Sequence, residues 1–161
     1  MDMQQRSQEI ELAISHSQIQ VRSRDYNEDY CQWGDTNIAQ GVIIQPGYIT
    51  FDPLVEEAFG ASVKLSVCEA FQADSRAERR MVVPFEVIDS GKLELLSVPM
   101  HAAIELPLVE GTYELYFEIC QENEVYYRIT FVPAKGEFEA RTLLNDEWGG
   151  VEGEPLQEGY I

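Results

Sequence analysis

The chain has 161 residues, 45% of them hydrophobic, which is enough for one globular domain with a substantial core. It carries 29 acidic and 11 basic residues, a formal net charge of −18, and only three of the basic residues follow position 100. Nucleic acids and anionic membranes repel such a chain, so direct binding to DNA or RNA is not expected. The skewed charge favours a basic protein partner, and general solubility is the alternative explanation.

The cysteines and the hydrophobic segments indicate where the protein resides. Cys31, Cys68 and Cys120 form no CxxC pair and are odd in number, which fits free thiols in a reducing compartment. The N-terminal residues contain no apolar run of the length of a signal peptide, and no stretch of about 18 apolar residues occurs. The sequence therefore predicts a soluble, cytoplasmic protein with no membrane span.

The first predicted element is a strand over residues 9–21. Ile10 and Leu12 alternate with polar residues, as they do on a strand that buries one face. The alternation breaks around His16, where a bulge or bend is expected.

A short helix and a hairpin are predicted next. Residues 33–41 fit a helix with Asp35 as its N-cap and Gly41 as the left-handed residue that ends it. Residues 42–51 fit a β-hairpin whose turn is Pro46–Gly47. A second helical turn or a loop is expected over residues 52–60, because a proline follows a capping aspartate there.

The middle of the chain alternates between strands and polar connections. Residues 61–71 fit a strand, residues 72–80 a polar connection, and residues 81–87 another strand. Pro84 cannot donate a ladder hydrogen bond, which predicts an edge position or a bulge. Further strands are predicted over these ranges: 93–98, 102–106, 112–120, 125–132 and 138–144.

This pattern predicts a mainly β fold, an antiparallel β-sandwich with one or two short helical turns. Residues 1–144 would form the single sandwich domain. Residues 145–161 are acidic and glycine-rich and predict a flexible tail, with docking on the body or on a partner as the alternative.

No motif for catalysis or cofactor binding is present. The chain lacks a P-loop, a GxGxxG turn, a GxSxG elbow and an HExxH helix. His16 and His101 have no zinc-ligand spacing, so no catalytic residue, metal site or cofactor is predicted. A hydrolase with two carboxylates is the enzyme alternative, but proximity of two acids among 29 carries almost no information.

The strand at 112–120 predicts a surface on which acids and aromatics mix. Glu114, Tyr116 and Glu118 share the face opposite the apolar one, and such a face suits an interface with Arg and Lys. We predict partner contacts there and at the start of the tail, at Asp146, Glu147 and Trp148. The alternative function for exposed aromatics is a binding module for carbohydrate or peptide.

Several short motifs occur together in a fixed order. They are Leu12-Ala13-Ile14-Ser15, Trp33-x-Asp35 with Ile38-Ala39-Gln40-Gly41, Gly47-Tyr48-Ile49-Thr50-Phe51, Met81-Val82-Val83-Pro84-Phe85-Glu86-Val87 with Gly91, and Leu106-Pro107 followed by Gly111-x-Tyr113-x-Leu115. In this order and spacing the chain resembles the competence protein J (ComJ) family from about residue 10 to about residue 132. The arginine-rich connection at 72–80 and the residues beyond about 133 depart from the family pattern.

The resemblance implies a small acidic protein without enzymatic activity that inhibits the DNA-entry nuclease, a metal-dependent, non-specific DNA endonuclease. An immunity protein against a related nuclease toxin is the second form of this function. The family provides no motif for the inhibitory residues, so the contacts predicted above rest on the sequence pattern alone.

Overall fold

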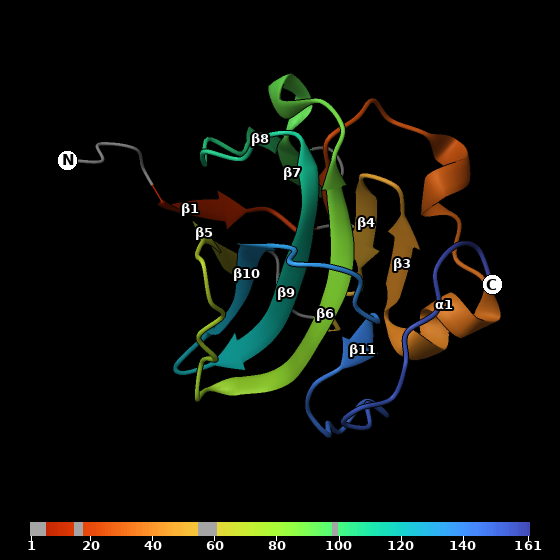
Figure 1. Cartoon of the computed structure of the whole chain (residues 1–161). Coiled ribbons are helices and arrows are strands. Elements are labelled where there is room, and N and C mark those ends of the chain that lie inside the picture. The colour runs from red at the N-terminus through yellow and green to blue at the C-terminus, as the bar shows by residue number, and fades with distance from the viewer. Residues whose placement is uncertain (1–5, 15–17, 55–60, 98–99) are drawn as a thin grey trace.

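The computed structural model describes residues 6–14, 18–54, 61–97 and 100–161 as two facing β-sheets with short helical pieces at one side (Figure 1). The first sheet has six strands in the order β1-β5-β10-β9-β6-β11. Their bounds in that order are Ser7–Leu12, Ala61–Val67, Val125–Pro133, Gly111–Gln121, Ala77–Val87 and Arg141–Thr142. The predicted mainly β sandwich is confirmed.

The second sheet has five strands in the order β3-β4-β2-β7-β8, all in antiparallel pairs. Their bounds in that order are Val42–Gln45, Tyr48–Phe51, Ile19–Arg22, Glu94–Ser97 and Met100–Ala103. The six-stranded sheet differs in one respect, because β10 pairs with β5 in parallel. Period-two patterning does not reveal strand direction, so this parallel pair could not be predicted from the sequence.

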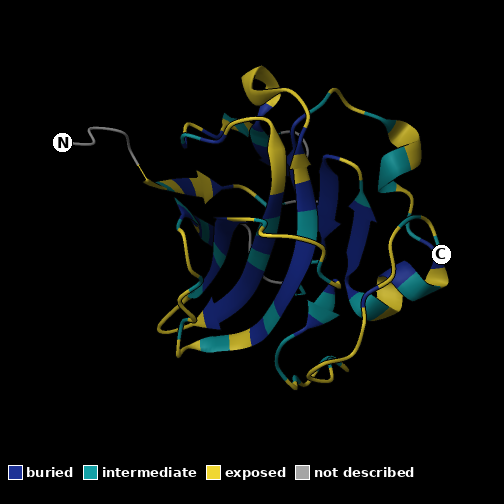
Figure 2. Ribbon diagram, in the orientation of Figure 1, coloured by how far each residue is buried: buried dark blue, intermediate teal, exposed yellow. Residues whose placement is uncertain are grey.

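The core lies between the sheets and takes alternate residues from both (Figure 2). Its centre is the stack of Phe117 from β9 on Phe51 from β4, with ring centroids 4.0 Å apart and planes inclined by 7°. Tyr127 of β10 lies beside Phe117, at 5.9 Å between centroids. All three side chains are fully buried, so this aromatic column joins the two layers directly.

The strand predicted over residues 9–21 is two strands that belong to different sheets. Leu12 ends β1 in the six-stranded sheet, and Ile19 begins β2 in the five-stranded sheet. Both residues are buried in the common core, which is why one alternation pattern runs through them. The bend expected near His16 lies outside the described residues.

The helix α1 runs over Asp35–Gln40, and Gly41 ends it in the left-handed conformation at φ 81°, as predicted. The predicted N-cap was wrong, because Gly34 holds that position and Asp35 is already helical. The backbone oxygen of Ile161 accepts from the amides of Thr36 and Asn37, so it replaces a capping side chain.

Among the described residues, two 3-10 turns accompany α1, namely η1 at Glu28–Cys31 and η2 at Ser90–Lys92. Of the helical turn expected over residues 52–60, positions 55–60 lie outside the described residues. In the described part of the chain, none of the helices is long and apolar enough to cross a membrane.

The hairpin of β3 and β4 turns at Pro46–Gly47 as predicted. Gly47 has φ 64°, and a Cβ there would lie 2.8 Å from the side chains of Ser23 and Ile88. Both the conformation and the close contact therefore require glycine.

Two features of β6 bear on the surfaces described below. Pro84 lies in the part of β6 beyond its pairing with β11, where the strand is the edge of the sheet, as predicted. The polar connection predicted over residues 72–80 was too long, because β6 already begins at Ala77 and includes Arg79 and Arg80.

The aromatic column gives a test of the layer arrangement. Replacing Phe117 with alanine removes the ring between Phe51 and Tyr127 and leaves a cavity between the sheets. We expect the free energy of unfolding in urea to fall by about 3–5 kcal/mol. Val109→Ala is the control, since Val109 is 68% exposed and its truncation should cost less than about 0.5 kcal/mol. Equal losses for the two variants would contradict this core.

Candidate functional site

The outer face of the six-stranded sheet contains three of the predicted contact residues. Glu114, Tyr116 and Glu118 alternate along β9 on the side away from the core. In the neighbouring strands, Tyr116 is level with Val82 of β6, which is level with Arg141 of β11. The three residues therefore share a face, as the sequence indicated, but their surroundings differ.

Tyr116 is held from two sides. Its ring stacks on Phe71, with centroids 3.9 Å apart and planes inclined by 5°, and its hydroxyl donates to Glu114 Oε1 at 2.7 Å. Burial, and then the hydrogen bond and negative charge of Glu114, raise the pKa of Tyr116 to about 12. The phenol thus stays protonated and fixes the position of the half-buried Glu114 carboxylate.

Glu118 is fully buried and already paired. Its carboxylate accepts from Arg80 Nε at 2.9 Å and from Arg128 Nη1 at 2.5 Å, and it also accepts from the backbone amide of Asp74 at 3.1 Å. A carboxylate with two arginines and no exposed surface cannot reach a partner's cations directly. The expectation that Glu118 lies exposed beside Tyr116 is wrong, because a chain segment covers it.

That covering chain is the 68–76 segment, which connects β5 to β6 across the outer face of the sheet. The arginines that hold Glu118 also bind its backbone: Arg80 Nη2 donates to the Asp74 carbonyl at 2.9 Å, and Arg128 Nη1 donates to the Gln72 carbonyl at 3.2 Å. Tyr126 completes the attachment by donating to Asp74 Oδ2 at 2.6 Å. The segment carries Phe71, which stacks on Tyr116. The buried ion pairs therefore hold this pair of aromatic rings in place.

The other three predicted contact residues lie beyond β11. Asp146 is buried against Arg79, with Oδ2 3.5 Å from Nε, and its Oδ1 accepts from the amides of Trp148 at 2.9 Å and Gly150 at 2.8 Å. Glu147 is exposed and Trp148 half-buried. Asp146 therefore shapes the loop, while its two neighbours reach the surface.

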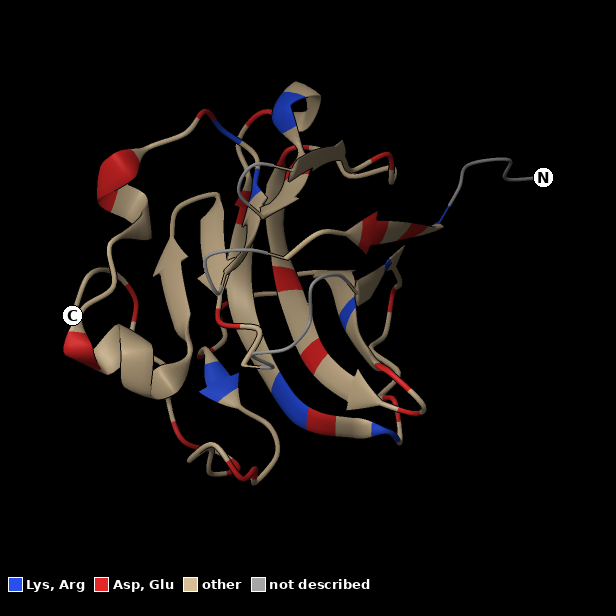
Figure 3. Ribbon diagram, turned by 180° about the vertical axis from the view of Figure 1, so that it is seen from behind, with Lys and Arg blue, Asp and Glu red and all other residues tan. Residues whose placement is uncertain are grey.

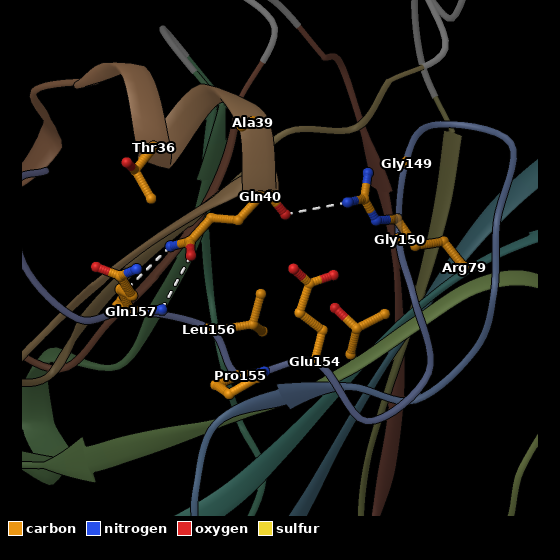
Figure 4. Close-up of a pocket in the computed structure, with 11 residues that line it drawn as sticks. Thr36, Ala39, Gln40, Arg79, Gly149, Gly150, Glu154, Pro155, Leu156 and Gln157 are labelled. Atoms are coloured by element: carbon orange, nitrogen blue, oxygen red, sulfur yellow. Dashed lines mark hydrogen bonds between the residues drawn. The ribbon is translucent and has the colours of Figure 1, made fainter.

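Residues 145–161 lie against α1 and leave a cavity of about 230 Å³ beside it (Figure 4). Gln40 spans this gap, because its side chain donates to the Gln157 carbonyl and accepts from the Gln157 amide, each at 2.9 Å. Arg79 closes one end by donating to the Gln40 carbonyl at 3.0 Å. Flexibility of this tail stays a prediction, and these contacts favour the docked alternative.

The predicted residues thus form two groups, and no hydrogen bond or ion pair in the described parts of the chain joins them. Sequence reasoning missed the residues that organise both groups, namely Arg79, Arg80 and Arg128. Extending the alternation of 81–87 back by two positions would have placed Arg79 on the inner side and Arg80 on the outer side.

The described residues contain no group of side chains that could hold a metal ion. Within residues 6–14, 18–54, 61–97 and 100–161, no three His, Cys, Asp or Glu side chains converge as metal ligands would. The acidic residues are instead distributed over strands such as β1, β6 and β9, over η1 and α1, and over the loops and the C-terminal segment (Figure 3).

We predict that Glu118 is structural and Glu114 is not. Glu118→Gln leaves Arg80 and Arg128 without their buried counter-charge, so the free energy of unfolding should fall by about 3 kcal/mol. Glu114→Gln keeps an acceptor for Tyr116 and should change it by less than about 0.5 kcal/mol. Urea denaturation measures both, and equal effects would refute the assignment.

Ionisation of Tyr116 should also lower the free energy of unfolding at alkaline pH. Its pKa is raised from 10.0 to about 12 on folding, so its contribution to stability is complete below pH 10 and is lost as the pH rises toward 12. Tyr116→Phe should therefore flatten the decline in unfolding free energy over this window. An unchanged slope in this variant would show that the phenol does not titrate as described.

The family model of competence protein J (ComJ) matches residues 11–132. The crystal structure of ComJ from Bacillus subtilis, inhibitor of the DNA degrading activity of NucA, aligns with a TM-score of 0.67 at 22% identity, covering 83% of this chain and 100% of that chain. A comparison with curated protein sequences gives no match. The family match spans most of the chain and confirms the resemblance seen in the sequence: the protein belongs to the competence protein J family.

Proposed function

We propose that this protein is an inhibitor, and not an enzyme, that blocks the DNA-binding cleft of a metal-dependent, non-specific DNA endonuclease. The observation that carries the proposal is the family match over residues 11–132, together with the inhibitory activity for which the B. subtilis relative is described. The three cysteines of the present chain are free thiols, which supports a cytoplasmic site of action.

The physical basis is the replacement of phosphates by carboxylates. A nuclease that binds DNA without sequence preference uses Lys and Arg to neutralise the backbone. A chain of net charge −18 is attracted to that cleft over long range, which raises the association rate and disfavours neutral or acidic proteins as partners.

The six predicted contact residues differ in their exposure to solvent, and we assign them different roles accordingly. Glu114 and Tyr116 on the sheet, and Glu147 and Trp148 beyond β11, retain accessible surface and form the proposed contact set. Glu118 and Asp146 carry buried ion-paired carboxylates, so they act as positioning residues beneath the two groups. Fixed carboxylates and rigid aromatics lose little entropy on binding, which favours slow release.

The segment from residue 133 onward lies outside the family match and carries seven acidic and two basic residues. This added charge supports a partner adapted to this particular chain, either a DNA-entry nuclease or a related nuclease toxin. Either kind of nuclease has to neutralise the DNA backbone with Lys and Arg, so the identity of the bound nuclease distinguishes them.

The direct test is capture of the partner from the cells that make the protein, with the full chain as bait. We expect a DNA endonuclease whose degradation of plasmid DNA stops when about one equivalent of the chain is added. A captured nuclease that remains fully active with excess chain, or hydrolysis of a small substrate by the chain itself, would contradict the proposal.

Charge reversal tests the proposed surface. Glu114→Lys with Glu147→Lys should lower the association rate with the captured nuclease by roughly tenfold and weaken its dependence on salt. Glu28→Lys with Asp29→Lys is the control, because this pair makes the same charge change on the exposed turn η1, away from the six-stranded sheet. If the control pair has as large an effect as the test pair, the six-stranded sheet is not the interface.

A further inference from the structure

Strand β2 directs two polar side chains to the outer face of the five-stranded sheet, and both are buried. Ile19 and Val21 of β2 enter the core, so the intervening Gln20 and the following Arg22 point to the other side. Gln20 is only 2% exposed and Arg22 only 6% exposed. Burying an amide and a guanidinium outside the core is costly unless their hydrogen bonds are satisfied.

A cavity of about 300 Å³ opens onto this face. Gln20 and Arg22 line it from β2, Leu96 and His101 from β7 and β8, and Tyr26 and Cys31 from the chain around η1. Leu96 lies level with Gln20 in the strand pairing, and His101 lies level with Leu96. The cavity thus has a polar floor and walls that are mostly apolar, the usual composition of a small-ligand site.

Two atoms on the floor have no hydrogen-bond partner in the part of the chain that the structure describes: the acceptor Gln20 Oε1 and the donor Arg22 Nε. Their neighbouring atoms are occupied, because Gln20 Nε2 donates to Gln18 at 3.2 Å and Arg22 Nη1 donates to the Tyr48 hydroxyl at 3.4 Å. One open donor and one open acceptor therefore belong to two residues that line the same cavity.

The charge of the site is balanced. Arg22 Nη2 lies 3.7 Å from Glu94 Oε1, so the guanidinium already has a counter-charge close to the cavity. A carboxylate ligand would bring only acceptors toward Gln20 Oε1 and Glu94, and an ammonium would bring only donors toward Arg22. A neutral group with both a donor and an acceptor fits both open atoms.

We propose that this cavity binds a primary carboxamide, the group at the end of Asn and Gln side chains. Its carbonyl accepts from Arg22 Nε, its NH₂ donates to Gln20 Oε1, and a short aliphatic stem lies along Leu96. A primary amide presents its carbonyl and one N–H on the same edge, whereas a trans peptide bond points them in opposite directions. The cavity is therefore selective for the primary amide, and this holds whether or not the chain inhibits a nuclease.

The test uses ¹⁵N NMR of the full chain, observing the Gln20 side-chain amide and the Arg22 Nε–H signals. Propionamide should shift both signals and saturate. Propionate and N-methylacetamide, matched in size, should leave them in place at the same concentrations. Saturable shifts with either of these, at an affinity equal to that of propionamide, would overturn the proposal. The whole series is measured on the unmodified chain, so it does not depend on whether a variant folds.

Two variants and two glutamine probes refine the result. Gln20→Met removes the acceptor and should weaken propionamide binding about tenfold. Gln45→Met makes the same change on the same sheet, outside the cavity, and should leave affinity unchanged. Undiminished binding to Gln20→Met would contradict the assigned role.

Two glutamine probes distinguish the possible sources of the amide. If N-acetylglutamine methylamide binds better than free glutamine, the amide comes from a protein side chain. The reverse order identifies a metabolite.

Discussion

The structure depends on two successive arginines at the start of β6 that point to opposite sides of the sheet. Arg80 faces outward, pairs with Glu118, and holds the 68–76 segment over the sheet. Arg79 faces the other way, pairs with Asp146, and binds the end of α1. Each guanidinium is balanced by a fully buried carboxylate, so removing either acid would leave a desolvated cation.

This arrangement decides which carboxylates remain accessible to a partner protein. In a chain with 29 acidic residues, the carboxylates of Glu118 and Asp146 are committed to folding, while acids near them, such as Glu114 and Glu147, remain accessible. The buried pairs fix two loops, and the loops stack Phe71 on Tyr116 and hold Trp148 beside Asp146. The proposed acidic surface is therefore rigid because its supporting charges are neutralised beneath it.

Much of the fold was predictable from local pattern. The alternation over residues 112–120, the turn at Pro46–Gly47 and the glycine that ends α1 each depend on contacts within a few residues. The N-cap of α1 and the partners of Glu118 come from distant parts of the chain, so no local pattern reveals them. The same holds for the cavity beside β2, which residues from several strands and η1 assemble.

An inhibitor that occupies the DNA-binding cleft of its nuclease, as we propose for this protein, competes with DNA for that cleft. The decisive measurement is the apparent inhibition constant of the full chain against its nuclease at increasing concentrations of DNA. Competition for the cleft predicts that this constant rises in proportion to the DNA concentration once DNA exceeds its own dissociation constant. A constant that stays the same as DNA increases would show that the inhibitor binds elsewhere, and the account of carboxylates in place of phosphates would be wrong.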